Sequence, residues 1–97
     1  MLFRSRMAAA EYRALSSDAQ SLQERIERYG AAVIKPAEQR TAAATAAYRS
    51  NQGSLMTLFE ARHAQVEVQR KLLTLQRDLA KTRAQLGFRP LVSGGAR

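Results

Sequence analysis

The chain has 97 residues, with sixteen Lys and Arg against eight Asp and Glu, and no cysteine. This length allows at most one domain, and the lack of cysteine excludes a disulfide framework and a thiolate metal site. The net charge of +8 would suit nucleic acid or anionic lipid, but the charges are interspersed and aromatic residues are few, which favours solvated or inter-helix faces instead.

The first five residues fit poorly with the alanine-rich stretch that follows them. We interpret residues 1–5 as a non-native or disordered N-terminus of a truncated reading frame. No apolar run reaches the roughly 18 residues that a membrane-spanning helix needs, and nothing resembles a signal peptide. An upstream region could have carried both features, so their absence here excludes little.

A first helix is predicted over residues 7–50, because apolar residues recur three and four positions apart along one stripe. Gly30 and Pro36 interrupt this pattern. Since a proline removes one backbone hydrogen bond and crowds the carbonyl four residues earlier, we expect a kink between Ala32 and Pro36 rather than a break. Residues 41–47 are almost all small, which permits close approach of a neighbouring helix. The stripe consists of Leu15, Ala19, Leu22, Ile26, Tyr29 and Val33.

A tight reversal is predicted over residues 51–53. Asn51 and Gly53 are residue types that tolerate left-handed backbone, and Ser54 can cap a new helix. The chain therefore reads as helix, turn, helix.

A second helix is predicted over residues 54–86, and it carries two adjacent stripes with heptad spacing. A helix with two seams has two neighbours, as in a multi-helix bundle or a tube of side-by-side helices. The first stripe consists of Leu58, Ala61, Gln65, Val68, Leu72, Leu75, Leu79, Thr82 and Leu86. The second consists of Leu55, Phe59, Arg62, Val66, Gln69, Leu73, Gln76 and Ala80.

The predicted fold is all-α: residues 6–88 form a long antiparallel coiled-coil-like helical hairpin. Gly87, Pro90 and the run at residues 93–95 predict a flexible tail over residues 89–97. Two helices alone bury little apolar surface, so we expect a partner or an oligomer.

Several short motifs within residues 34–88 carry a resemblance to a known family. They are Pro36, the pattern A-x-x-A-Y that ends at Tyr48, the glycine-bearing turn with Ser54 and Leu55, the run LFEAR at residues 58–62, and A-x-L-x-F at residues 84–88. This string resembles the C-terminal helical hairpin of TolC-type outer-membrane efflux channels. It is most similar to the heavy-metal branch, the outer-membrane components of cobalt–zinc–cadmium and copper efflux systems, and the likeness covers about residues 8–88.

The resemblance implies a homotrimer whose helices form a tube in the periplasm, joined to the cell outer membrane through a part of the parent protein outside this chain. The turn would lie at the periplasmic entrance. Tyr48 falls where the family has an entrance tyrosine, and Thr57 and Glu60 fall where many members place acidic residues around the pore. Thr57 is not acidic, so one ring is missing, and Asn51 stands where glycine is usual.

The resemblance also implies partners: a periplasmic adaptor protein and an inner-membrane pump that supplies the energy. The adaptor would meet the tip, which consists of Arg49, Asn51, Gln52, Gly53, Ser54 and Leu55. The duct itself would conduct its substrate passively, and metal cations are one candidate substrate. It would use no cofactor.

The residues also allow plainer interpretations. Tyr48 can be a packing residue, and Glu60 can be an ordinary solvated helix acid. His63 is the only histidine and has no ligand partner at metal-binding spacing, and no set of catalytic side chains can be assembled, so we expect neither a metal site nor an enzyme. The main alternative is the helical hairpin of a periplasmic adaptor (membrane fusion) protein from such an efflux system. A basic coiled coil that binds nucleic acid is a third, but aromatic stacking residues are lacking.

Overall fold

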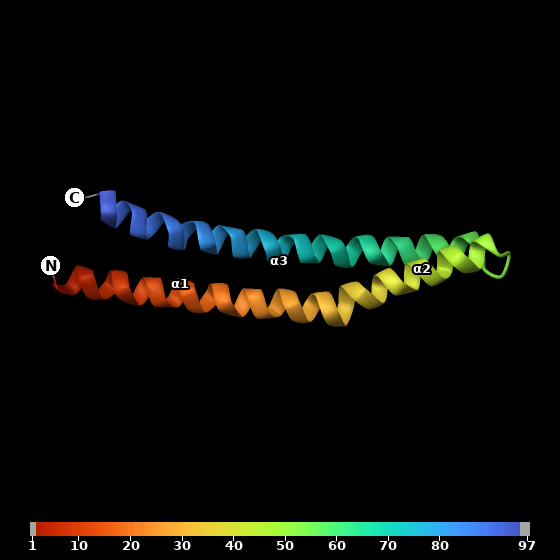
Figure 1. Cartoon of the computed structure of the whole chain (residues 1–97), viewed down its shortest axis with the longest axis horizontal. Coiled ribbons are helices and arrows are strands. Elements are labelled where there is room, and N and C mark those ends of the chain that lie inside the picture. Colours follow the sequence, from red (N-terminus) through yellow and green to blue (C-terminus); the bar gives the residue numbers. More distant parts are fainter. Residues whose placement is uncertain (1, 96–97) are drawn as a thin grey trace. The chain divides into compact units, whose positions relative to one another are not determined.

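The computed structural model describes the backbone of residues 2–95 and the side chains of residues 8–87. Within this part the chain is all-helical, without a strand, and it folds as a hairpin (Figure 1). Helix α1 (Leu2–Tyr29) runs directly into a π-helical turn, η1 (Gly30–Ile34), and then into α2 (Lys35–Arg49). After a short reversal, α3 (Leu55–Gly95) returns antiparallel. The predicted two-arm hairpin is confirmed.

Both helical arms extend beyond the predicted bounds. Helix α1 already begins at Leu2, and α3 passes Gly87 and Pro90 to end at Gly95, where we had predicted a flexible tail. Both residues are unfavourable inside a helix without excluding it: glycine costs about 1 kcal/mol relative to alanine, and proline, whose φ is close to the helical value, costs about 3 kcal/mol because it removes a hydrogen bond and crowds a carbonyl. Residues 1, 96 and 97 of the two predicted terminal segments lie outside the described residues.

The chain divides into two units, and the one at the turn consists of Ile26–Thr74. Here α2 packs against the first half of α3 through small side chains, and Ala61 is only 2% exposed. The Thr41 hydroxyl lies 3.3 Å from the carbonyl oxygen of Ala61 across the helix pair and 3.1 Å from that of Ala37 in its own helix. The Lys71 ammonium lies 5.6 Å from the centre of the Tyr29 ring. Short side chains thus let α2 and α3 approach closely, as predicted from residues 41–47.

The second unit consists of Met1–Arg25 and Leu75–Arg97. Its core is formed by Leu75 and Leu79 of α3, which are both buried, with Leu15 and Leu22 of α1 half-buried. At its edge, Arg83 donates a hydrogen bond from Nη2 to Oε1 of Gln23 at 2.9 Å. Among its described residues, this unit is held by an apolar seam with a polar contact beside it.

The two predicted stripes of α3 behave differently. Every member of the first stripe is buried or half-buried, and every member of the second is exposed. The six predicted seam residues of the first arm are all half-buried. The heptad pattern therefore identified the packed seam correctly, and it also identified a second seam that the described part of the chain leaves open.

The π-helical turn is where the packing departs from a simple heptad. Lys35 donates its backbone N–H to the carbonyl of Gly30, five residues earlier, and Ile34 is buried although we had placed only Val33 on the stripe. Ile26 and Ile34 are eight residues apart rather than seven. A π-helical turn holds one residue more than an α-helical turn, so it absorbs this extra residue and keeps the seam facing α3. After Ile34, seam positions recur at the heptad spacing, as at Thr41.

Figure 1 shows the ribbon bending at this turn, so that α2 runs toward α3. The bend overlaps the predicted kink between Ala32 and Pro36. Pro36 follows the widened turn and has no backbone N–H to donate. A π-bulge beside a proline is a recognised cause of such bends.

Candidate functional site at the turn

The end of α2 is closed by a well-formed backbone cap. Gln52 donates its N–H to the carbonyl of Ala47 at 2.8 Å, and Asn51 donates its N–H to that of Tyr48 at 3.1 Å. These two bonds define a Schellman motif, which needs one residue in left-handed backbone. Asn51 occupies that position with a φ of 61°, which confirms the prediction that this residue adopts left-handed backbone.

Gly53 is required for a different reason from the one we predicted. It does not have a positive φ, so left-handed backbone does not explain it. Instead its N–H bonds to the carbonyl of Ala47 at 3.0 Å, and a Cβ added to Gly53 would lie 2.9 Å from the Cβ of Ala47. The glycine therefore lets the returning chain pass close to the last turns of α2.

Ser54 caps the start of α3, as predicted. Its Oγ accepts a hydrogen bond from the backbone N–H of Thr57 at 3.1 Å, and the two hydroxyl oxygens lie 2.9 Å apart. This is the N-cap arrangement, with a threonine where a capping box has Glu or Gln. Thr57, which the family resemblance placed at an acidic ring, thus has a local structural role here.

Several exposed apolar side chains belong to residues close to this turn in the sequence. Met56 is 66% exposed, and Tyr48, Leu55 and Phe59 are also exposed. Each of these four side chains keeps at least 40% of its surface exposed in the described part of the chain. Solvent-exposed apolar groups beside a rigid turn suit a contact surface for another protein.

Polar groups complete the tip. Arg49, in the last turn of α2, and Gln52 are both exposed, and a cation there is favourable because helix carbonyls end at that point. Glu60 is exposed on α3 and makes no ion pair or hydrogen bond among the described residues. A free carboxylate in the second turn of α3 is available to attract a cation. In the described part of the chain, no three His, Cys, Asp or Glu side chains gather in a way that could hold a metal ion.

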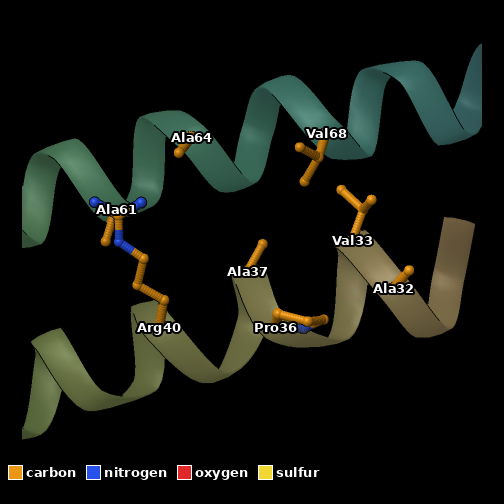
Figure 2. A pocket seen from close by; sticks show the side chains of 8 residues that line it. All are labelled: Ala32, Val33, Pro36, Ala37, Arg40, Ala61, Ala64 and Val68. Carbon is orange, nitrogen blue, oxygen red and sulfur yellow. The ribbon is translucent and has the colours of Figure 1, made fainter.

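A shallow groove of about 300 Å³ lies between α3 and the segment formed by the π-helical turn and the first half of α2 (Figure 2). Arg40 extends toward Ala61 at one end, and Val33 and Val68 face each other at the other end. Chemically the groove offers apolar contact and one guanidinium group. No buried side-chain nitrogen or oxygen in the described residues lacks a partner, so the groove presents no unsatisfied polar atom. The lining residues are Ala32, Val33, Pro36, Ala37, Arg40, Ala61, Ala64 and Val68.

The structure thus brings the predicted tip residues together on one reversal, whereas Glu60 lies farther along α3. Sequence reasoning missed Thr41, whose hydroxyl reaches the other helix. A polar residue on a stripe of small residues was the available signal, but which carbonyl it reaches depends on the register of α2 against α3.

Comparison with known proteins adds no family to this description: no protein-family model, no curated protein and no solved structure matches the chain. Among the described residues, no helix combines the length and the apolar character needed to cross a membrane.

Proposed function

We propose that this chain is the helical hairpin of an outer-membrane efflux duct of the TolC type, from the branch that exports heavy metals. In this proposal three copies of the parent protein form a tube in the periplasm. The turn lies at its entrance, where it receives substrate from a periplasmic adaptor and an inner-membrane pump. The duct conducts metal cations passively and is not an enzyme.

The observation that carries the proposal is the string of motifs from Pro36 to Phe88 and its position on the hairpin. The motifs flank a rigid, well-capped turn, and the apolar side chains beside this turn are exposed. The open second stripe of α3 supports it as well, because a helix in a tube needs a neighbour on each side. Glu60 is exposed close to the turn, as an entrance carboxylate would need to be.

The test is a chimeric channel in which residues 8–88 replace the C-terminal hairpin of a TolC-type heavy-metal channel. We expect the chimera to form trimers and to restore metal tolerance in cells that lack the channel. Glu60→Gln should then lower the cation selectivity of the reconstituted channel without loss of the trimer, because three carboxylates around a pore attract cations.

Glu67→Gln is the matched control for that substitution. It removes the same charge from an exposed glutamate one heptad farther from the turn. No effect of Glu60→Gln would place Glu60 away from the pore. Equal effects of the two substitutions would place both glutamates, which share one side of α3, along the pore and would contradict a special position of Glu60 at its entrance. A chimera that fails in the channel, while the same hairpin functions when grafted into a periplasmic adaptor, would favour the adaptor alternative.

Adaptor docking is tested at exposed tip residues rather than at Gly53, because replacing Gly53 would disturb the turn itself. Arg49→Ala and Leu55→Ala should weaken adaptor binding to the chimera and reduce efflux together. Lys35→Ala is the control, because Lys35 is exposed and lies at the opposite end of α2 from the turn. A normal adaptor affinity in both tip variants would contradict docking at this surface.

A further inference from the structure

The second stripe of α3 presents three large apolar side chains at heptad spacing. Phe59, Val66 and Leu73 are 55%, 44% and 59% exposed, and each is seven residues from the next. Residues seven apart lie on the same side of a helix, which is the spacing that a second helix uses for knobs-into-holes packing. In the unit Ile26–Thr74, no other element covers them.

Positive charge accompanies this stripe. Arg62 lies on the stripe between Phe59 and Val66, is exposed, and makes no ion pair among the described residues. Arg70 lies beside the stripe, about 40° around the helix from Val66, whereas Glu67 lies about 100° from it. Arg70 and Glu67 approach to 3.9 Å, but both are exposed, and such a pair is weak. The face is therefore apolar with basic residues within it and at its edge.

We propose that this face binds a helix of another chain whose seam is apolar and whose flanking positions are acidic. The same face of a second copy fits poorly. A two-fold antiparallel pair centred on Val66 would bring Arg62 of each copy against Arg70 of the other, and a parallel pair would bring Arg62 against Arg62. Like charges across a helix interface disfavour pairing, whereas carboxylates opposite both arginines favour it. The proposal does not depend on the efflux function, since it rests on α3 alone.

A membrane surface is a poorer fit than a helix. A helix that lies on a lipid surface has a broad apolar face, whereas here Arg62 and Gln69 interrupt a narrow stripe. Both residues can still be accommodated at the edge of a helix–helix seam, where long polar side chains reach water.

The test uses the full chain and two synthetic peptides of about four heptads. Both have the same leucine and valine seam; one carries glutamate and the other lysine at the flanking positions. Each peptide repels itself, so each is available to bind. With a fluorescent label and anisotropy as the readout, we expect the glutamate peptide to bind at least about tenfold more tightly than the lysine peptide.

Variants of the chain locate the site. Val66→Ala with Leu73→Ala should weaken binding of the glutamate peptide by about tenfold or more, because apolar contact is lost. Arg62→Glu with Arg70→Glu should reverse the preference between the peptides. Arg28→Glu with Lys35→Glu makes the same change of net charge away from the stripe and should preserve the preference. All of these side chains are exposed, and circular dichroism checks that helicity is retained.

Three results would overturn the proposal. One is equal binding of the two peptides. Another is a loss of binding in the Arg28 and Lys35 variant as large as in the stripe variants, which would mean attraction by net charge alone. The third is that the stripe variants lose self-association of the chain, or binding to vesicles that contain phosphatidylglycerol, while the peptides do not bind. That result would assign the face to a second copy or to a lipid surface.

Discussion

Replacing Gly53 by alanine should destabilise the hairpin through one close contact. The new Cβ would lie 2.9 Å from the Cβ of Ala47, closer than such atoms pack, and 3.4 Å from both the carbonyl carbon of Ala47 and the nitrogen of Tyr48. None of these three atoms can rotate away, because the Cβ of Ala47 is fixed to the backbone and the other two are backbone atoms. The turn must therefore open, which weakens the hydrogen bonds that Gln52 and Gly53 donate to Ala47.

The expected magnitude follows from two opposing effects. Forcing an extra methyl group into a packed site costs about 1–3 kcal/mol. Because the φ of Gly53 is not left-handed, alanine also restricts the unfolded chain, which returns about 0.4–1 kcal/mol. The net loss should be about 1–2 kcal/mol, or a fall in Tm of about 5–10 °C for a chain of this size.

Thermal and urea unfolding followed by circular dichroism measure this loss, with every variant at the same protein concentration. Gly87→Ala is the matched control, because a Cβ there meets nothing within 4 Å and the residue lies inside α3. The Gly87→Ala substitution should raise the free energy of unfolding by about 0.5–1 kcal/mol. The two glycine substitutions are thus expected to have opposite signs.

A double-mutant cycle with Ala47→Gly tests the cause. Removing the methyl group of Ala47 should cost about 0.5–1 kcal/mol by itself, because glycine is unfavourable in a helix. In that background Gly53→Ala should cost little, since the closest contact is gone. Additive effects of the two substitutions, or a Gly53→Ala variant as stable as the original chain, would refute the steric explanation.

Three further predictions concern the cap, the helix interface and the π-helical turn. Ser54→Ala should lower the free energy of unfolding by about 1 kcal/mol because the N–H of Thr57 loses its acceptor, whereas Ser54→Asp, which keeps an acceptor, should lose much less. Equal losses in the two variants would contradict the cap. In urea unfolding, Thr41→Val should lower the free energy of unfolding by about 1 kcal/mol, because the Thr41 hydroxyl reaches Ala61 across the helices. Thr45→Val loses only a hydrogen bond within α2 and should have a smaller effect. Two single-residue deletions, both made in a Pro36→Ala background, test the π-helical turn. Deletion of Ala31 should restore an uninterrupted heptad and change the free energy of unfolding by less than about 1 kcal/mol. Deletion of Ala43 should rotate the seam by about 100° and lower the free energy of unfolding by about 2 kcal/mol or more. A similar thermal shift for the two deletions would show that the π-helical turn does not compensate an extra residue.

Local chemistry explains why much of the hairpin could be predicted from the sequence. Heptad spacing identifies a buried face because residues three and four apart share one side of a helix, and both stripes of α3 were found in this way. The cap at Ser54 and the left-handed Asn51 are likewise properties of a few adjacent residues. These features depend on the chain within one or two turns.

The tertiary structure decided the features that depend on two segments meeting. Whether Pro36 would kink a regular helix or follow a π-helical turn depends on which residues must face α3, and the buried Ile34 shows that one extra residue had to be absorbed. Gly53 was predicted for its backbone freedom, but its role is to leave space beside Ala47, which is a distance between segments and not a local preference. The same holds for the bond from Thr41 to Ala61. The second stripe is apolar by sequence, and only the packed hairpin shows that no part of Ile26–Thr74 covers it.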